Sequence, residues 1–371
     1  MNEEEYIYSI ALTRVSGIGS IWAKNLLNTM GNATTVFQEK KELSRLMPGI
    51  STRITEALKD QTFLSRAEQE YEYTIKNRIQ CLTIQEEAYP ARLRECADAP
   101  ILLFYKGTAD LNVPRIVSVV GTRNATDYGI RLCEHFFKEL QAICPDILVV
   151  SGLAYGIDIH AHRAAIAHQF PTVGVLAHGL DRIYPSVHSK TAIEMLEHGG
   201  LLTEYVSGTT PDKYNFVSRN RIIAGISDVT IVVESAMKGG ALITADIAGS
   251  YHRECFAFPG RADDSLSQGC NYLIRSNKAS LIQSAEDFVQ AMSWDTQSQQ
   301  NTKHIQRNLF PDLSDDEQRI VDLLEKQGNM QINQLVVASN IPVHKMSAML
   351  FELEMKGILR VLAGGMYQLL H

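Results

Sequence analysis

The spacing of hydrophobic residues changes near residue 80. Beyond this point, short runs rich in Val, Ile and Leu, bounded by Gly or Pro, alternate with longer amphipathic stretches. This alternation predicts βαβ units and therefore an α/β fold with an open, mostly parallel sheet. We expect strands at 116–120, 148–150, 173–176, 201–203, 229–233 and 255–258. We expect helices near 127–143, 157–169, 187–198, 219–226, 241–252 and 286–292. Leu82–Ile84 and Ile101–Tyr105 are expected to add strands to the front of this sheet.

Residues 1–75 predict a separate module, in which short helices surround two turns rich in small residues. The turns are Val15–Gly19 and Met47–Ile50, and each precedes a helical run. In a helix-hairpin-helix pair, glycines at such turns let backbone N–H groups face a phosphate. A tight turn in a helical bundle has the same sequence pattern. Because Lys24 is the only basic residue in the first of these helices up to Met30, we favour a packing or protein-contact role.

The end of the chain predicts a winged helix behind a linker. Residues 293–312 are polar, rich in amides and without periodicity, which is typical of a linker. Residues 313–371 show three helical runs followed by a hairpin with glycines at its turn. These segments are 314–327, 331–338, 343–356, Ile358–Val361 and Met366–Leu369.

The third helical run of this module carries no excess of positive charge. Its Lys345 and Lys356 are balanced by Glu352 and Glu354. A winged helix that reads duplex DNA often does so through this helix. We therefore favour a protein-contact role for the module.

Composition limits the classes of function. The chain of 371 residues is 45% hydrophobic and 21% charged, which indicates two or three globular domains. Lys and Arg total 35 against 42 Asp and Glu, and the net charge of −7 argues against a general nucleic-acid binder. The chain lacks a long apolar run and starts with acidic residues, so a cytoplasmic protein is expected. Six separated cysteines without a Cys-x-x-Cys pair predict neither a disulfide framework nor a zinc site, and we expect no metal or cofactor.

A site for an anion therefore needs positive charge that the fold gathers on one face. The first central strand runs into Gly121 and Thr122, and Arg123 follows with a charged fork that matches phosphate geometry. Ligands of open α/β sheets bind at such strand ends, where helix N–H groups are available to an anion. The next strand delivers Ser151 and Gly152, which are small enough to let an anion approach the backbone. A structural Arg123 that pairs with an acid is the alternative.

Acidic and histidine side chains follow in the next helix. Asp158, His160 and His162 are spaced by two residues, so the three do not share one helix face. A helix-start cap and a core-facing histidine are therefore favoured over a metal site.

The segment 211–221 combines positive charge with aromatic rings. Lys213, Arg219 and Arg221 lie within nine residues, with Tyr214 and Phe216 between them. Cations along a backbone track and rings for base stacking are the features that bind single-stranded nucleic acid. A loop whose rings anchor it to the core is the alternative. The residues expected to contact nucleic acid here are Lys213, Asn215, Phe216, Arg219 and Arg221.

A glycine pair follows the strand at 229–233. Lys238, Gly239 and Gly240 stand directly before a helix and are expected to cradle an anion with backbone groups. Basic residues thus fall after strand ends or in the long loop, while many acids fall within helices. We therefore expect positive charge to gather at the strand-end face of the sheet, away from the acids on the helices.

Several sequence blocks lie between about 115 and 282, in the order VVGTRNATDYG, SGLAYGID, LAHGLDRIYP, LLTEY, FVSRNRIIAGIS, ESAMKGGALITA, FAFPG and QGCNYLI. Together, and in this order, they resemble the DNA-processing protein A family, also called DprA or Smf. The segments RNRIIAG and GGALITA are the specific ones, and the flanking helical and winged-helix modules fit as well.

The resemblance implies an extended Rossmann-like domain over 80–292, between a helical domain at 1–75 and a winged helix at 313–371. It also implies a protein without enzymatic activity that binds single-stranded DNA and protects incoming strands in natural transformation and DNA recombination. Loading of the RecA recombinase and homodimerisation are further implications. By motif position, the residues that resemble DNA contacts are Arg123, Lys213, Arg219 and Arg221.

Two departures from the family pattern bear on the expected DNA contacts. The family often has Arg where Tyr155 stands, so a contact at 155 is not implied. It often has Ser where Gly239 stands, which leaves a backbone cradle intact.

Two other classes of function use related modules. A nucleotide phosphoribohydrolase needs a Pro-Gly-Gly-x-Gly-Thr loop and a following Glu, whereas the loop after Lys238 lacks the third Gly and the Glu. A winged-helix regulator with a ligand-sensing Rossmann domain conflicts with the neutral third helix.

Overall fold

The structure is a computed structural model that describes residues 1–39, 43–47, 50–294, 313–362 and 365–370. The chain divides into two compact units, each assembled from separate parts of the sequence. The first unit comprises Met1–Asn112 and Thr172–Ile226, and the second comprises Val113–Pro171 and Ser227–His371. This division differs from the three consecutive modules expected from the sequence, which remain a prediction.

The first unit begins with a bundle of short helices. Asn2 caps the first helix by accepting a hydrogen bond from the Glu5 N–H at 2.9 Å. Gly17, with φ of +89°, makes the turn between the first two helices, a conformation that glycine adopts without strain. The helices are α1 (Glu3–Arg14), α2 (Ser20–Met30), α3 (Ala33–Gln38), α4 (Leu43–Leu46), α5 (Thr52–Ala57) and α6 (Thr62–Lys76). Part of the second expected turn, residues 48–49, lies outside the described residues.

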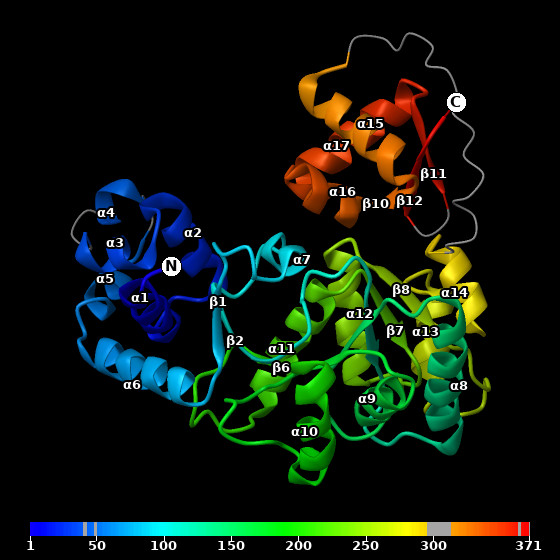
Figure 1. Cartoon of the computed structure of the whole chain (residues 1–371), viewed down its shortest axis with the longest axis horizontal. Coiled ribbons are helices and arrows are strands. Elements are labelled where there is room, and N and C mark those ends of the chain that lie inside the picture. Colours follow the sequence, from blue (N-terminus) through cyan, green and yellow to red (C-terminus); the bar gives the residue numbers. More distant parts are fainter. Residues whose placement is uncertain (40–42, 48–49, 295–312, 363–364, 371) are drawn as a thin grey trace. The chain divides into compact units, whose positions relative to one another are not determined.

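The rest of the first unit holds four hydrogen-bonded strands (Figure 1). Their order is β1 (Gln80–Thr83), β2 (Leu102–Gly107), β6 (Gly200–Thr203) and β5 (Thr172–Val175). The pairs β1–β2 and β2–β6 are antiparallel, and β5–β6 is parallel. The strands expected from residues 80–112 are thus confirmed. The helical segments of this part are α7 (Ala91–Arg94), η1 (Ser186–His188), α10 (Ser189–His198) and α11 (Lys213–Ile226).

The second unit contains a parallel sheet with buried central strands. Its strand order is β4 (Leu148–Ser151), β3 (Ile116–Val120), β7 (Val229–Val232), β8 (Glu254–Ala257) and β9 (Ser280–Leu281). Strands covered on both faces read as continuous apolar runs, which is why the sequence pattern located them. Its helices are α8 (Asp127–Ile143), α9 (Ile157–Ala167), α12 (Gly240–Ser250), α13 (Gln268–Arg275) and α14 (Ala285–Ala291). The predicted α/β fold with a mostly parallel sheet is confirmed.

Aromatic side chains dominate the core beneath α8. Phe136 of α8 packs edge-on against Phe258 and Phe288, with ring centroids 5.7 and 5.5 Å apart. This core fixes α8 and the end of β3 relative to each other.

The last elements form the predicted winged helix. They are α15 (Asp315–Gln327), β10 (Met330–Gln331), α16 (Ile332–Ser339), α17 (Val343–Met355), β11 (Leu359–Leu362) and β12 (Met366–Leu369). Ser314 and Glu317 form a capping box at the start of α15. Residues 295–312 of the expected linker lie outside the described residues.

Two expectations about helices need correction. The basic stretch around 213–221, interpreted as a loop, belongs to α11, which begins at Lys213 rather than near residue 219. Helix α13 was not expected from the sequence. None of the described helices combines the length and the apolar character that a membrane span requires.

Candidate nucleic-acid interface

In the second unit, the loop between β3 and α8 holds Arg123 at an exposed position. Gly121 permits the close approach at its start, because a Cβ there would lie 2.4 Å from Ile157 Cγ1 and 2.9 Å from the Glu234 carbonyl oxygen. The Thr122 N–H donates to that same carbonyl at 2.7 Å, and the Thr122 carbonyl accepts from the Ile157 N–H at 3.0 Å. The backbone of this loop is therefore fixed on both sides, while the Arg123 side chain is exposed.

Glu234 occupies the N-terminus of α8 from within the protein. Its carboxylate accepts hydrogen bonds from the Thr126 N–H at 2.9 Å and the Thr126 hydroxyl at 2.6 Å, and Glu234 is buried. Thr126 in turn caps α8 by accepting from the Gly129 N–H at 3.3 Å. A carboxylate here is favoured by the helix dipole. Because a buried carboxylate already lies beside this helix start, the arrangement does not favour an external anion there, and the expectation that its N–H groups bind one stays a prediction.

Ser151 and Gly152 lie inside the protein rather than at a surface. Both are buried, and the Ser151 hydroxyl donates to the Val119 carbonyl of the neighbouring strand at 2.6 Å. The prediction that an anion approaches the backbone at these residues is not supported by this arrangement. The short side chain serves a strand-to-strand contact instead.

The glycine pair after β7 forms the start of α12. The Gly239 N–H donates to the Ala236 carbonyl at 2.9 Å, and a Cβ at Gly239 would lie 2.3 Å from Ser235 Oγ. Gly239 thus stands in a tight turn, where an added Cβ would crowd the Ser235 hydroxyl. Gly240 and Lys238 are exposed, and no acid lies in the first turn of α12. An anion can approach this helix start without meeting a carboxylate from that turn.

In the first unit, the start of α11 exposes a cation beside an aromatic ring. Lys213 is exposed, and Tyr214 is 82% exposed. Phe216, in contrast, is half-buried and packs against Tyr184 with ring centroids 5.9 Å apart. Asn215 is also half-buried, and its carbonyl accepts a hydrogen bond from the Tyr205 hydroxyl at 3.4 Å. The ring available for stacking on a base is therefore Tyr214.

Arg219 holds α11 in place from its buried side. It is 3% exposed, and its Nη1 donates to the Val175 carbonyl at 3.0 Å. Its guanidinium lies 6.0 Å from the centroid of the Phe216 ring, within the range of a cation–π contact. The expectation that Arg219 reaches DNA directly is wrong for this structure, because the helix turns that residue toward the sheet.

Arg221 forms an ion pair with the half-buried Glu204. Its Nη2 lies 2.5 Å from Glu204 Oε2 and donates to the Ser20 hydroxyl at 3.2 Å. Burial raises the pKa of Glu204, and the neighbouring Arg221 opposes that rise. Arg221 therefore compensates a buried carboxylate here, which departs from the direct DNA contact expected from the motif.

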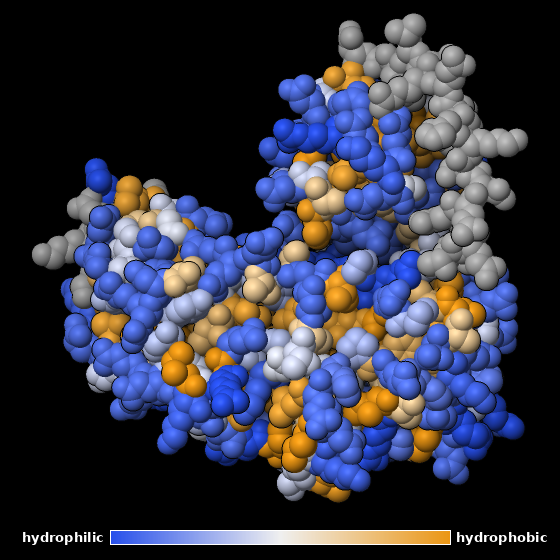
Figure 2. All heavy atoms as spheres, viewed as in Figure 1, coloured by the Kyte–Doolittle hydropathy of each residue, from blue (hydrophilic) through white to orange (hydrophobic). Residues whose placement is uncertain are grey.

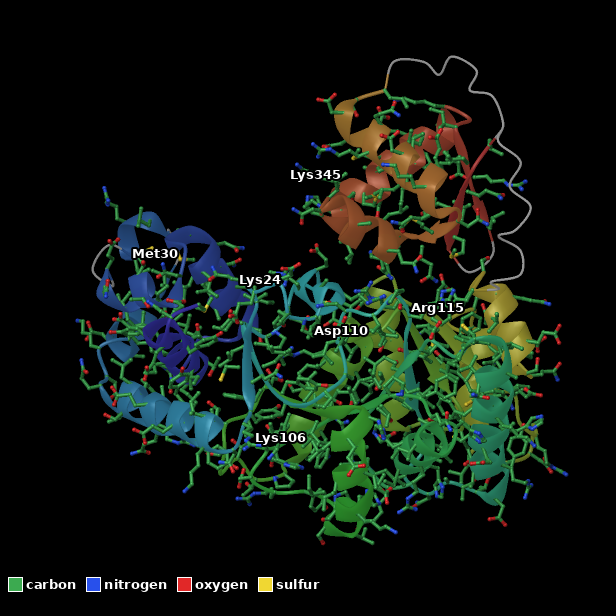
Figure 3. The ribbon with its side chains drawn as sticks, viewed as in Figure 1. Lys24, Met30, Lys106, Asp110, Arg115 and Lys345 are labelled. Atoms are coloured by element: carbon green, nitrogen blue, oxygen red, sulfur yellow. The ribbon has the colours of Figure 1, made fainter. Side chains whose placement is uncertain are left out.

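Lys24 anchors α2 against the end of α7 and the residues that follow it. Its Nζ donates to the carbonyls of Arg94 and Cys96 at 2.7 and 3.0 Å (Figure 3). Burial lowers the pKa of this lysine. These contacts favour the packing interpretation of the first helical turn over a phosphate contact.

Within the described residues, no cluster of three or more His, Cys, Asp or Glu side chains is placed to hold a metal ion. Asp158 and His162 are both buried in α9, in agreement with the core-facing histidine expected from the sequence.

The roles of Glu234 and Tyr214 at this candidate interface were difficult to identify from the sequence. Glu234 was visible as an acid after a strand, but its role depends on the distant Thr126. Tyr214 was one of two rings in its segment, and only the helical arrangement separates it from Phe216. The sequence did contain one signal that Arg219 faces the core. Residues 219, 222 and 223 have the spacing of one helix face, and that face of α11 is buried.

Comparison with known proteins places the chain among DNA-processing proteins. A family model described as DNA recombination-mediator protein A matches residues 80–293, and a model of the DprA winged helix domain matches residues 309–365. The DNA processing protein DprA of Streptococcus pneumoniae is 40% identical over 207 residues, which cover 56% of this chain and 72% of that protein. The putative DNA processing protein DprA of Mycobacterium tuberculosis is 34% identical over 310 residues, covering 80% of this chain and 78% of that protein.

Two solved structures share the fold. The X-ray structure of DNA processing protein A from Streptococcus pneumoniae has a TM-score of 0.66 and 32% identity, covering 76% of this chain and 97% of that one. The DNA processing protein A of Helicobacter pylori has a TM-score of 0.53 and 29% identity, covering 58% of this chain and 96% of that one. The Helicobacter structure was reported for its single-stranded DNA binding mode.

Proposed function

Because the chain belongs to the DNA recombination-mediator protein A family, also called DprA or Smf, we propose that it binds single-stranded DNA for DNA processing in transformation and recombination. We further propose that it protects incoming strands and loads the RecA recombinase onto them. The family's description as a recombination mediator and the Helicobacter relative's single-stranded DNA binding support this proposal.

The start of α11 is the observation that carries the proposal. Lys213 and Tyr214 place a cation and an almost fully exposed ring side by side, on a helix whose opposite side is buried. A tyrosine exposed to this extent gains nothing from the protein core. Stacking on a base is worth roughly 1–3 kcal/mol and suits any sequence, because every base has a π-face.

The strand-end loops of the second unit supply further positive charge. Arg123 and Lys238 are both exposed, and each lies beside a backbone that internal hydrogen bonds hold in shape. Gly240 leaves the start of α12 open to a phosphate. We propose Arg123, Lys238 and Gly240 as phosphate contacts, with Gly121, Thr122 and Gly239 shaping the two loops.

Absence of enzymatic activity is part of the proposal. In a phosphoribohydrolase a free carboxylate would be needed near the glycine loop, and the nearest strand-end acid, Glu234, is held by both the N–H and the hydroxyl of Thr126.

We also propose a homodimer and the organisation into a helical module at 1–75, a Rossmann-like domain at 80–292, a linker at 293–312 and a winged helix at 313–371.

Photo-crosslinking tests the DNA contacts directly. An oligothymidylate carrying 5-iodouracil is irradiated with the full chain, and the crosslinked peptides are identified by mass spectrometry. We expect the main adduct at Tyr214, since crosslinking to iodouracil favours stacked aromatic rings. Adducts confined to residues 313–371 would contradict the proposal.

Recombinase loading needs its own experiment. RecA-catalysed strand exchange is measured on single-stranded DNA that is already coated with single-strand binding protein. We expect the full chain to shorten the lag, and Tyr214→Ala to lose this effect together with DNA binding. Normal DNA binding without any change in the lag would separate the two parts of the proposal and remove the loading step.

A further inference from the structure

Two side chains of α6 hold a single residue of the connection between β6 and α11. Residues 204–212 form this connection, and Ser207 lies within it. The Ser207 N–H donates to Glu70 Oε1 at 2.8 Å, and the Ser207 hydroxyl donates to Glu70 Oε2 at 2.5 Å. Arg66 Nη2 donates to the Ser207 carbonyl at 2.7 Å. The N–H, the hydroxyl and the carbonyl of Ser207 are thus all engaged by α6.

Glu70 is turned toward this connection and away from solvent. It is 2% exposed, whereas Glu68 and Glu72 of the same helix are exposed. Figure 2 shows a mostly hydrophilic surface where α6 lies in Figure 1. Arg66 Nη2 lies 2.8 Å from Glu70 Oε2 and compensates the buried charge. A buried carboxylate that is satisfied in this way is rigid, so it can fix the backbone that it contacts.

The connection is held at further points before α11 begins. The Gly208 N–H donates to Asp181 Oδ1 at 2.9 Å. At the other end of the connection, Asp212 Oδ1 accepts a hydrogen bond from the Tyr214 N–H at 2.8 Å. The place at which α11 begins is therefore set by contacts on both sides of residues 209–211.

We propose that Glu70 is a positioning residue for the exposed cation and ring at the start of α11. It fixes Ser207, and through the connection it keeps Lys213 and Tyr214 where one strand can meet them both. Binding then requires less ordering of the protein, which favours affinity. This inference rests on the proposed single-stranded DNA binding. It gives the helical bundle an indirect part in that binding, in which α6 itself does not touch DNA.

A contact that only stabilises the fold would show the same hydrogen bonds, but the two roles differ in what Glu70 is coupled to. If Glu70 positions Lys213 and Tyr214, its removal has no further effect on binding once both of those side chains are gone. If it only holds the fold together, its removal weakens binding by the same factor whether or not they are present. A double-mutant cycle therefore separates the two roles.

Hydrogen exchange of the free full chain tests the local step. In Glu70→Ala, the Ser207 amide loses its acceptor, and we expect it to exchange at least about tenfold faster. The matched control Glu68→Ala, at an exposed position on the same helix, keeps the natural rate. Urea unfolding verifies that both variants are folded. Unchanged exchange over residues 207–214 in Glu70→Ala overturns the proposal.

The affinity for an oligothymidylate, measured by fluorescence anisotropy at low salt, tests the coupling. We expect Glu70→Ala to weaken binding about fivefold, the effect of about one more residue to be ordered, and Glu68→Ala to bind like the natural chain. In the background Lys213→Ala/Tyr214→Ala, we expect Glu70→Ala to change the affinity by less than about twofold. An equal loss in both backgrounds overturns the proposal.

Ser207→Ala is a milder variant, because it removes one hydroxyl and leaves the ion pair of Glu70 and Arg66 in place. We expect it to change exchange and affinity in the same direction by smaller factors. If Glu70→Ala does not fold, Ser207→Ala replaces it, and unchanged exchange together with unchanged affinity then overturns the proposal. Failure of the natural chain to bind the oligonucleotide removes the proposed function and this inference with it, whereas natural binding with an unaffected Glu70→Ala removes this inference alone.

Discussion

Exposure separates the basic residues that can meet DNA from those that cannot. Lys213 and Arg123 are exposed, while Arg219 is buried and Arg221 is engaged by Glu204. The sequence indicated correctly that charges and rings gather in one segment. It could not rank them, because a guanidinium in a motif looks the same whether it binds a phosphate or a carbonyl of its own protein.

Tyr214 is expected to contribute to binding through its ring alone. Tyr214→Ala should weaken binding of an unstructured oligonucleotide by roughly 1–3 kcal/mol, about 5- to 150-fold, at every sequence tested. The free energy of unfolding should change by less than about 0.5 kcal/mol, because the side chain is 82% exposed. Fluorescence anisotropy and urea unfolding measure the two effects.

Tyr214→Phe is the matched control, since it keeps the ring and removes only the hydroxyl. It should bind like the natural protein. A loss as large as that of Tyr214→Ala would show that the hydroxyl, rather than stacking, makes the contact.

Helix α11 is held by its buried side so that its first turn can face solvent. Arg219 donates to Val175 of β5, and Arg221 pairs with Glu204 just beyond β6. The hydrophobic period predicted most strands and most helices, since buried parallel strands and amphipathic helices have distinct patterns, but it did not predict the two-residue strands β9 and β10. It missed the first turn of α11, because Lys213 to Ser218 carry a mixture of charge and rings that reads as a loop.

Removing the ion pair of α11 should destabilise the protein. Arg221→Ala leaves Glu204 half-buried without its cation, and breaking such a pair costs about 3 kcal/mol. Urea unfolding gives this number, with Lys213→Ala as the exposed control that should change stability by less than about 0.5 kcal/mol. If Arg221→Ala were as stable as the natural protein yet bound DNA poorly, Arg221 would be a direct DNA contact after all.

The loop that carries Arg123 depends on Glu234. Glu234→Ala removes the acceptor for the Thr126 N–H and hydroxyl, which should cost about 1–3 kcal/mol of stability. Glu234→Gln keeps one acceptor oxygen and should lose less. Hydrogen exchange of the amides at 122–126 measures the effect locally, and equal protection in Glu234→Ala and the natural protein would show that the loop is held by other contacts.

The distribution of charge over the whole chain reconciles a net charge of −7 with DNA binding. The excess of Asp and Glu over Lys and Arg in the sequence argues against general binding of duplexes. What the sequence could not show is that Arg219 is buried and that the half-buried Lys24 donates to backbone carbonyls, which leaves fewer exposed cations for DNA than the motifs suggested.

The winged helix is expected to contribute little to single-strand binding. Deletion of residues 313–371 should leave the affinity for an unstructured oligonucleotide nearly intact, because the exposed face of α17 carries acids as well as Lys345. Fluorescence anisotropy at one salt concentration is sufficient for the comparison. A loss of tenfold or more would show that this module holds DNA.

The salt dependence of single-strand binding tests the central claim most directly. The affinity of the full chain for a short oligothymidylate is measured between 50 and 200 mM salt, beside Arg123→Ala, Lys213→Ala and the control Lys138→Ala, an exposed residue within α8. Each phosphate contact contributes about 0.7 to the slope of log affinity against log salt concentration for single strands. We predict that Arg123→Ala and Lys213→Ala each reduce this slope by about that amount and that Lys138→Ala does not. Unchanged slopes and affinities in both Arg123→Ala and Lys213→Ala would contradict the account.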